Sequence, residues 1–277
     1  MKLARIGPPG AERPALCRDG RYYDLSSVTD DRFFTPDRLE RIRAATDLPE
    51  IDMTGQRIAA PVPRPGVVLC VGQNYAAHAA ESGSEPPEHP VMFYKAPGTV
   101  IGPNDQVLIP RRSAKTDWEV ELAVVIGTTA RYLASPEDAV AHIAGYCLSN
   151  DVSERDFQLA VSGGQWSKGK SCETFQPLGP WLVTADEIAD VQDLRLRSWV
   201  NGEPRQDSST KDMIFSVAHL VWHLSQFTVL DPGDVINTGT PEGVALSGRF
   251  PYLRAGDVVE VEIDGLGRQR TPIGKAD

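Results

Sequence analysis

One segment of the sequence carries two carboxylates at a spacing that suits a metal ion. In DWEVELAVVIG (residues 117–127), a strand places Glu119 and Glu121 on one face, because successive side chains point to opposite sides. The carboxylates then lie about 6.6–7 Å apart. Beside small apolar residues they repel each other unless a cation neutralises them, and a hard divalent cation with oxygen ligands does so. The alternative is the solvated polar face of an amphipathic strand.

A second segment, SNDVSERDFQ (residues 149–158), adds groups that suit an anionic ligand. Asp151 ends a predicted strand just before a helix, and Arg155 and Gln158 follow four and seven residues later on one helical face. A carboxylate, a guanidinium and a carboxamide together could hold a metal and an anionic substrate. The alternative is a capping aspartate with two solvated polar residues.

A third segment, NYAAHAAESG (residues 74–83), offers a candidate general base. His78 and Glu81 lie three residues apart on a predicted short helix, so the carboxylate can orient the imidazole. An oriented imidazole is the commonest base for activating water. The Ser82–Ser84 stretch that follows indicates a mobile segment suited to closing over a site. Surface pairs with this spacing are also common.

Three further signals are weaker. The histidines of HLVWH (residues 219–223) have the spacing of a zinc motif but lack its glutamate, so we expect them to pack. Cys172 follows Lys170 closely, yet no oriented base for a thiol nucleophile is visible. The glycines of SGGQWSKGK (residues 162–170) match no phosphate-binding pattern and predict a loop with lysines.

The elements that must position these residues are mostly strands. Apolar runs predict strands over residues 67–71, 91–95, 100–110, 118–127, 146–151, 235–237 and 258–263. Helices are predicted over residues 74–82, 135–145, 153–161 and 214–227, and Asn201-Gly202 predicts a hairpin. Strands do not alternate with long helices, so we expect a β-rich α+β fold with mixed or antiparallel sheets.

The first sixty residues predict a small separate unit. Asp19-Gly20 indicates a hairpin within residues 15–25, and Thr35-Pro36 opens a helix to about residue 45. The proline-rich APVPRPG (residues 60–66) indicates a linker. We therefore divide the chain into an N-terminal hairpin and helix domain, residues 1–62, and a catalytic domain, residues 63–277.

Composition excludes some classes of partner. The 277 residues include 28 Lys and Arg against 38 Asp and Glu, a net charge of −10 that argues against nucleic acid. No stretch is apolar enough for a membrane span, and no export signal is visible. The four cysteines are scattered singly, which favours a reducing, cytoplasmic setting.

Taken together, five blocks resemble the fumarylacetoacetate hydrolase family, in particular its short acylpyruvase-like branch. They cover about residues 65–265 in the family's order: VGQNYAAHAAE, PVMFYKAP, DWEVELAVVIG, NDVSERDFQ with KGKSCETFQPLGPWL, and PGDVINTGTPEGV. GGQWSKGK and PLGPWLVT look most like members that hydrolyse 2,4-diketo-3-deoxy-L-fuconate or the corresponding rhamnonate. The chain departs from the common pattern at Glu173, Gln73 and residues 245–247, and the last two bear on the substrate more than on the metal.

The resemblance implies a role for each candidate residue. Glu119, Glu121 and Asp151 would bind Mg²⁺ or Mn²⁺, and Arg155, Gln158 and Lys170 would contact the keto-acid end of the substrate or stabilise its enolate. Thr240 would bind the substrate carboxylate, and His78 with Glu81 would form a water-activating dyad on a lid. The implied fold is a roll of packed sheets, usually in a homodimer.

The implied function is hydrolysis of the C3–C4 bond of a small anionic 2-oxo acid. The substrate would be an acylpyruvate or a 2,4-diketo-3-deoxy sugar acid, cleaved to pyruvate and a carboxylic acid. Two alternatives remain: an isomerase or decarboxylase of 2-oxo dienoic acids or 2-oxo diacids such as oxaloacetate, and a catalytically silent ligand-binding homologue.

Overall fold

The fold is built around strand β11 (Val120–Ile126), which is buried on both faces. The computed structural model describes residues 1–277. Val120, Leu122, Val124 and Ile126 belong to one hydrophobic core, and Ala123 and Val125 between them belong to a second core. The predicted alternation along this segment is confirmed.

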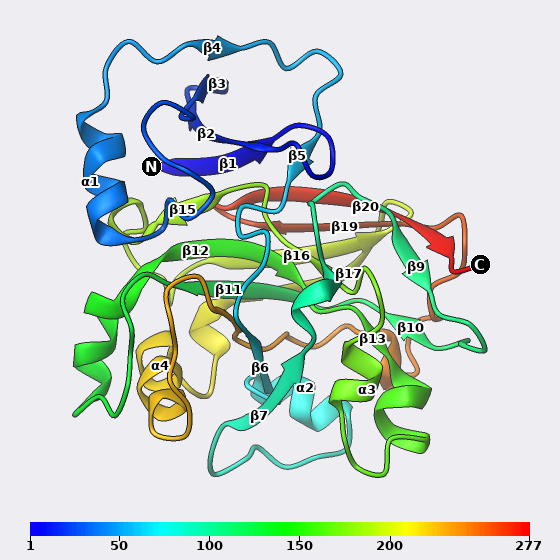
Figure 1. Ribbon diagram of the computed structural model, residues 1–277. Coiled ribbons are helices and arrows are strands. Elements are labelled where there is room, and N and C mark those ends of the chain that lie inside the picture. The colour runs from blue at the N-terminus through cyan, green and yellow to red at the C-terminus, as the bar shows by residue number, and fades with distance from the viewer.

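Strand β11 lies in an eleven-stranded sheet (Figure 1). The strand order is β4 (Glu50–Ile51), β3 (Arg21–Asp24), β2 (Arg13–Arg18), β1 (Lys2–Ile6), β15 (Leu182–Thr184), β12 (Ile143–Asn150), β11, β18 (Val235–Asn237), β6 (Val68–Gly72) and β7 (Val91–Lys95), with β5 (Ile58–Ala59) paired to β1. Only β18 and β6 pair in parallel in this sheet, so the predicted mixed, mostly antiparallel arrangement is confirmed.

A second sheet of five strands packs against β11 and β12. Its order is β17 (Glu203–Ser209), β16 (Arg195–Val200), β19 (Val258–Ile263), β20 (Gly267–Lys275) and β9 (Val107–Ile109). Two short pairs join β10 (Thr116–Asp117) to β13 (Ser153–Glu154) and β8 (Val100–Ile101) to β14 (Gln176–Pro177).

Helices are few and short. The α-helices are α1 (Pro36–Ala44), α2 (Ala76–Glu81), α3 (Ser167–Lys170) and α4 (Val217–Ser225). The 3₁₀ turns are η1 (Pro97–Thr99), η2 (Pro136–His142), η4 (Ala185–Glu187), η5 (Thr210–Asp212) and η6 (Ala245–Ser247), and η3 (Asp156–Ala160) is a π-helical turn. Helices α2 and α3 lie at the opposite end of the molecule from the N-terminal strands (Figure 1).

Both predicted hairpin turns are confirmed. Asp19 and Gly20 join β2 to β3 with φ of 51° and 76°, and Asn201 and Gly202 join β16 to β17 with φ of 54° and 82°. Positive φ at both central positions is what a tight hairpin turn requires.

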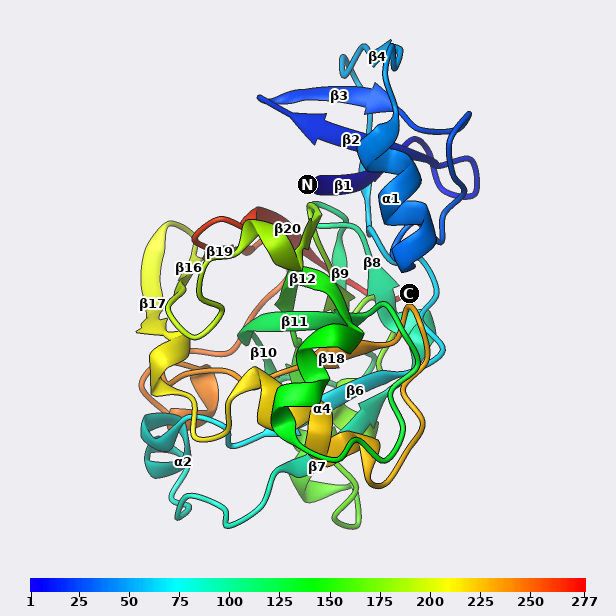
Figure 2. The same cartoon turned by 90° about the vertical axis from the view of Figure 1, so that its left-hand side faces the viewer.

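The N-terminal strands and α1 form a layer above the rest of the chain (Figure 2). This layer is tied to the central sheet because β1 pairs with β15, and because Trp181 Nε1 donates to the Tyr22 hydroxyl at 3.0 Å. The division of the chain at residue 62 stays a prediction.

Three predicted helices differ from the structure. Residues 136–142 form 3₁₀ turns, and β12 begins at Ile143. Gly145 lies in the sheet so close to the Val183 carbonyl that a Cβ would clash with it. Ser153 and Glu154 pair with β10, which leaves only η3 of the helix predicted over residues 153–161. Helix α4 is shorter than predicted, because the Ser216 side chain caps it at one end by accepting from His219 N.

No helix is long and apolar enough to cross a membrane.

Leu122→Ala tests how far the fold depends on β11. Leu122 is fully buried, and emptying such a site costs about 2–5 kcal/mol of unfolding free energy. Urea unfolding measures the loss, with Val140→Ala as the control, because Val140 is 60% exposed. A loss no larger than that of the control would show that the core does not depend on this strand.

Candidate active site

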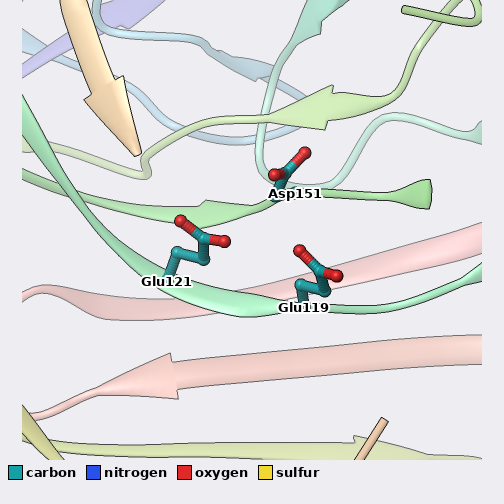
Figure 3. A group of neighbouring side chains, drawn as sticks. All are labelled: Glu119, Glu121 and Asp151. Atoms are coloured by element: carbon teal, nitrogen blue, oxygen red, sulfur yellow. The ribbon is translucent and has the colours of Figure 1, made fainter. Parts of the chain in front are cut away.

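The register of β11 and β12 brings three acidic residues together. Val120 lies opposite Asn150 in this antiparallel pair, and the Asp151 amide donates to the Glu119 carbonyl at 2.9 Å. Carboxylate oxygens of Glu119, Glu121 and Asp151 therefore lie within 4.8 Å of one another (Figure 3).

These carboxylates are buried, at 4%, 2% and 0% exposure for Glu119, Glu121 and Asp151. Burial opposes ionisation of Glu119, but Lys170 and Arg155 outweigh it and lower its pKa to about 2. Burial, then the charges of Asp151 and Glu119, raise the pKa of Glu121 well above its usual range. Glu121 is thus the carboxylate for which the chain provides least compensation.

Two buried lysines contact the acidic residues. Lys170 Nζ lies 2.5 Å from Glu119 Oε2 and 2.9 Å from Asp151 Oδ2. Burial opposes its positive charge, but Asp151 and Glu119 prevail and raise its pKa, so it is cationic at neutral pH. Lys95 Nζ pairs with Asp151 Oδ1 and donates to the carbonyls of Val152 at 3.0 Å and Phe175 at 2.7 Å.

Lys95 was not among the residues selected from the sequence. It ends β7, whose Phe93 and Lys95 are buried while Tyr94 between them is exposed. The sequence signal that could have identified Lys95 is its place on the same strand face as the apolar Phe93. A lysine on a buried face needs an anionic partner.

Arg155 links the acidic residues to the predicted amide. Its Nη2 lies 2.8 Å from both Asp117 Oδ2 and Glu119 Oε1, and its Nη1 donates to Gln158 Oε1 at 2.9 Å. The face shared by Arg155 and Gln158 is therefore present, although it belongs to a π-helical turn.

Asp117 is a second residue that sequence reasoning missed. Besides Arg155, it accepts from the amides of Ala245 and Leu246, each at 2.9 Å. It is fully buried, so it fixes the guanidinium and the turn η6 relative to each other. Nothing in the sequence near Asp117 predicts these contacts, because Ala245 and Leu246 lie 128 and 129 residues away along the chain.

His78 and Glu81 form the predicted pair on α2. His78 Nδ1 lies 3.0 Å from Glu81 Oε1, and both Glu81 oxygens accept from the Gly243 amide at 3.1 Å. Gly243 has φ of 102° and its Cα lies so near the Arg205 carbonyl that a side chain would clash. The predicted lid segment is thus docked on residues 239–243, with His78 only 7% exposed.

Thr240 is held in the same loop. Its hydroxyl donates to the Val120 carbonyl at 2.9 Å and accepts from Gln206 Nε2 at 2.8 Å. The preceding amide, of Gly239, donates to Glu121 Oε2 at 2.8 Å.

A cavity of about 230 Å³ brings the candidates together. Eight of the nine predicted residues line it, namely His78, Glu81, Glu119, Glu121, Arg155, Gln158, Lys170 and Thr240, whereas Asp151 is buried behind them. Its size suits a small molecule. A larger cavity of about 880 Å³ lies beside the N-terminal strands. Two of its three arginines, Arg5 and Arg57, pair with neighbouring acids, and it has no metal-type cluster.

The acidic residues fit a divalent cation. Four buried carboxylates, Asp117, Glu119, Glu121 and Asp151, face three buried cations, Lys95, Arg155 and Lys170. No lysine or arginine pairs with Glu121. Oxygen ligands with an excess negative charge are the set that Mg²⁺ and similar ions prefer.

The weaker sequence signals did not yield a site. His219 and His223 stack on α4, with ring centroids 6.0 Å apart, and belong to no metal-type cluster. Burial raises the pKa of the Cys172 thiol to about 11, which disfavours a thiolate nucleophile.

Comparisons of the sequence and of the structure with known proteins point to the same family. The sequence model described as fumarylacetoacetate (FAA) hydrolase C-terminal matches residues 67–274. A Sphingomonas 2,4-didehydro-3-deoxy-L-rhamnonate hydrolase is 45% identical over 99% of this chain and 96% of its own. A fumarylacetoacetate hydrolase structure from Exiguobacterium antarcticum is 36% identical with TM-score 0.85, and a 5-carboxymethyl-2-hydroxymuconate delta-isomerase structure from Mycobacterium smegmatis is 34% identical with TM-score 0.80; both align over the full length of both chains.

Glu121→Gln tests the fit to a cation. Because the folded chain raises the pKa of Glu121, the folded state binds more protons than the unfolded state, and stability falls as pH rises above about 4.5. The amide removes that cost, so we expect the variant without metal to melt at or above the wild-type temperature at pH 7 and to lose stabilisation by Mg²⁺.

Glu119→Gln is the matched comparison. It breaks pairs with Lys170 and Arg155, so it should lower the melting temperature as well as metal binding. Thermal melts with Mg²⁺ and with chelator measure both effects. Full Mg²⁺ stabilisation of the Glu121 variant would contradict the assignment.

Proposed function

Because the chain belongs to the fumarylacetoacetate hydrolase family, we propose that it is a divalent-metal-dependent hydrolase that cleaves the C3–C4 bond of a 2,4-dioxo acid. The products are pyruvate and a carboxylic acid. The observation that carries this proposal is the His78–Glu81 pair, 3.0 Å apart, in the same cavity as the acidic cluster. Hydrolysis needs a base for water, and this pair supplies one.

The relative from Sphingomonas favours one substrate class within this group. A 2,4-didehydro-3-deoxyrhamnonate is chemically 5-hydroxy-2,4-dioxohexanoate, and its hydrolysis yields pyruvate and lactate. We propose a short 2,4-diketo-3-deoxy sugar acid of this kind as the substrate, ahead of alkyl or aryl acylpyruvates.

His78 acts first in the proposed mechanism. Glu81 binds Nδ1 and leaves Nε2 to take a proton from water. The hydroxide equivalent adds to C4, the C3–C4 bond breaks, and its electron pair passes to C3 to give the enolate of pyruvate. A proton delivered to C3 completes pyruvate, and the C4 fragment leaves as a carboxylic acid.

The buried cations are proposed to stabilise the enolate. Lys170 keeps its charge in the cavity, and Arg155 and Gln158 present donors beside it, so negative charge developing on the 2-oxo group is stabilised. Thr240 is proposed to bind the substrate carboxylate through its backbone amide, because its hydroxyl proton goes to the Val120 carbonyl. Glu119, Glu121 and Asp151 would hold Mg²⁺ or Mn²⁺, which when bound supplies a Lewis acid for the 2-oxo group.

An isomerase is the second candidate, favoured by the 34% identity to the Mycobacterium smegmatis delta-isomerase. Isomerisation and decarboxylation of 2-oxo acids also need a stabilised enolate. Neither needs a base that activates water, so the His78–Glu81 pair supports hydrolysis over both. The homodimer implied by the family resemblance stays a prediction.

A product assay tests the reaction class. The wild-type protein is incubated with acylpyruvates, 5-hydroxy-2,4-dioxohexanoate, oxaloacetate and a 2-oxo dienoic acid, with Mg²⁺ and with chelator. We expect pyruvate and a carboxylic acid in equal amounts, only with metal. Release of CO₂, or a spectral shift without cleavage, would identify one of the rivals, and no turnover despite bound metal would favour a silent homologue.

His78→Ala tests the proposed base. We expect the variant to bind Mg²⁺ as the wild type does and to lose about 10²–10⁴-fold in kcat, the range of general base catalysis. Glu119→Ala should lose metal and activity together. His142→Ala is the control, because His142 does not line the cavity. A His78 variant that hydrolyses substrate at the wild-type rate would refute the dyad.

A further inference from the structure

The two buried lysines of the acidic cluster are held in different ways. Lys95 Nζ pairs with Asp151 Oδ1 and donates to the backbone carbonyls of Val152 at 3.0 Å and Phe175 at 2.7 Å. An ammonium has three protons to donate, so the chain itself uses all of them. Lys95 does not line the cavity. It is therefore a fixed part of the fold.

Lys170 depends instead on the carboxylates that suit a metal ion. Its Nζ lies 2.5 Å from Glu119 Oε2 and 2.9 Å from Asp151 Oδ2, and its one other partner, the Asp151 carbonyl, is 3.4 Å away. Both short contacts are thus made to candidate metal ligands. Unlike Lys95, Lys170 belongs to the lining of the cavity.

Every oxygen of Glu119 and Asp151 has a cationic partner. Besides the two contacts of Lys170, Arg155 lies 2.8 Å from Glu119 Oε1, and Lys95 pairs with Asp151 Oδ1. A divalent cation bound by these two carboxylates therefore faces positive charges at close range. Like charges repel strongly where water is excluded, so the metal competes with the cations already present.

Lys170 is the cation that other groups hold least. Arg155 is also paired with Asp117 and donates to Gln158, and Lys95 is held by two backbone carbonyls. Lys170 has no comparable second anchor. It is therefore the partner that a metal displaces at the lowest cost.

The side chain of Lys170 can move while its backbone stays in place. Gly169 packs on the Glu154 carbonyl so closely that a Cβ would lie 2.4 Å from it, which fixes α3. The four-carbon stem of lysine is flexible. Phe93 also lines the cavity, and its ring centroid lies 5.3 Å from Lys170 Nζ, within the range of a cation–π contact. The ammonium thus keeps a favourable neighbour when it leaves the acids.

The charges of the cluster are consistent with such an exchange. With every group ionised, the four buried carboxylates exceed the three buried cations by one charge. A divalent cation converts this into an excess of one positive charge. An anionic ligand in the cavity can then balance the excess, and a displaced ammonium is available to contact it.

We propose that Lys170 is an exchangeable counter-ion of the acidic cluster. Without metal it neutralises Glu119 and Asp151, and a divalent cation displaces its ammonium from both carboxylates toward the cavity, where the proposed substrate binds. The proposal rests on the metal-dependent part of the proposed function. Lys95 keeps its place with and without metal.

Lys170→Met tests the exchange, with Lys168→Met and Lys95→Met as matched controls. Calorimetric titration with Mg²⁺ should show about tenfold tighter binding by Lys170→Met than by the wild type, because a competing charge is gone. The variant should melt below the wild type in chelator and gain more from Mg²⁺. Lys168 is exposed on the same helix, so its variant should behave as the wild type does. Lys95→Met should stay destabilised with Mg²⁺, because a metal cannot accept the role of a donor to two carbonyls.

The outcomes separate the exchange from the proposed function. Equal or weaker Mg²⁺ binding by Lys170→Met than by the wild type would overturn the exchange while metal-dependent hydrolysis stands. If Lys170→Met does not fold, reductive methylation of the wild type decides: Lys170 should be modified faster with Mg²⁺ than with chelator, and Lys95 protected in both, whereas an unchanged rate at Lys170 overturns the exchange. If the wild type binds neither Mg²⁺ nor Mn²⁺, the metal-dependent function itself is refuted, and the exchange falls with it.

Discussion

The structure depends on one buried cluster of charges that must be balanced. Four carboxylates and three cations lie almost fully out of water at the end of β11. Removing one partner from such a cluster leaves an uncompensated buried charge, which is far more costly than losing a surface ion pair. Each partner comes from a different element: Lys95 ends β7, Asp151 follows β12 and Lys170 ends α3. The arrangement of strands and connecting turns is therefore constrained by the positions that these charges need.

Whether a residue of this cluster could be predicted depends on how far along the chain its partners lie. Glu119 and Glu121 could be predicted, because the alternation of side chains along a strand is a local pattern and places both on the same face. That Asp151 joins them depends on the register of β11 and β12, which the family resemblance supplied and local patterns did not. Lys95 and Asp117 were missed because their partners lie 56 and 128 residues away along the chain, and neither has a distinctive neighbour in sequence.

The same distinction explains the fold predictions. The turns at Asp19-Gly20 and Asn201-Gly202 were predicted correctly, because positive φ at two adjacent positions is a local demand that few residues meet. The helix predicted to reach Gly145 was wrong, because close packing on β15 draws residues 143–145 into the sheet. Tertiary packing overrides local propensity where a strand pairing is available.

The separation of the acidic cluster from the His78–Glu81 pair is compatible with different reactions on one scaffold. In the proposed mechanism the buried cations stabilise an enolate, a need that hydrolases and isomerases of 2-oxo acids share, so relatives of both names are compatible with the same acidic cluster. Under that proposal the reaction type depends on the group that activates water, and His78 with Glu81 lies on a different element from the β11 strand. Because the proposed base lies on α2 and the acids lie on and beside β11, a change in α2 would alter the proposed hydrolysis while leaving the metal-type cluster intact.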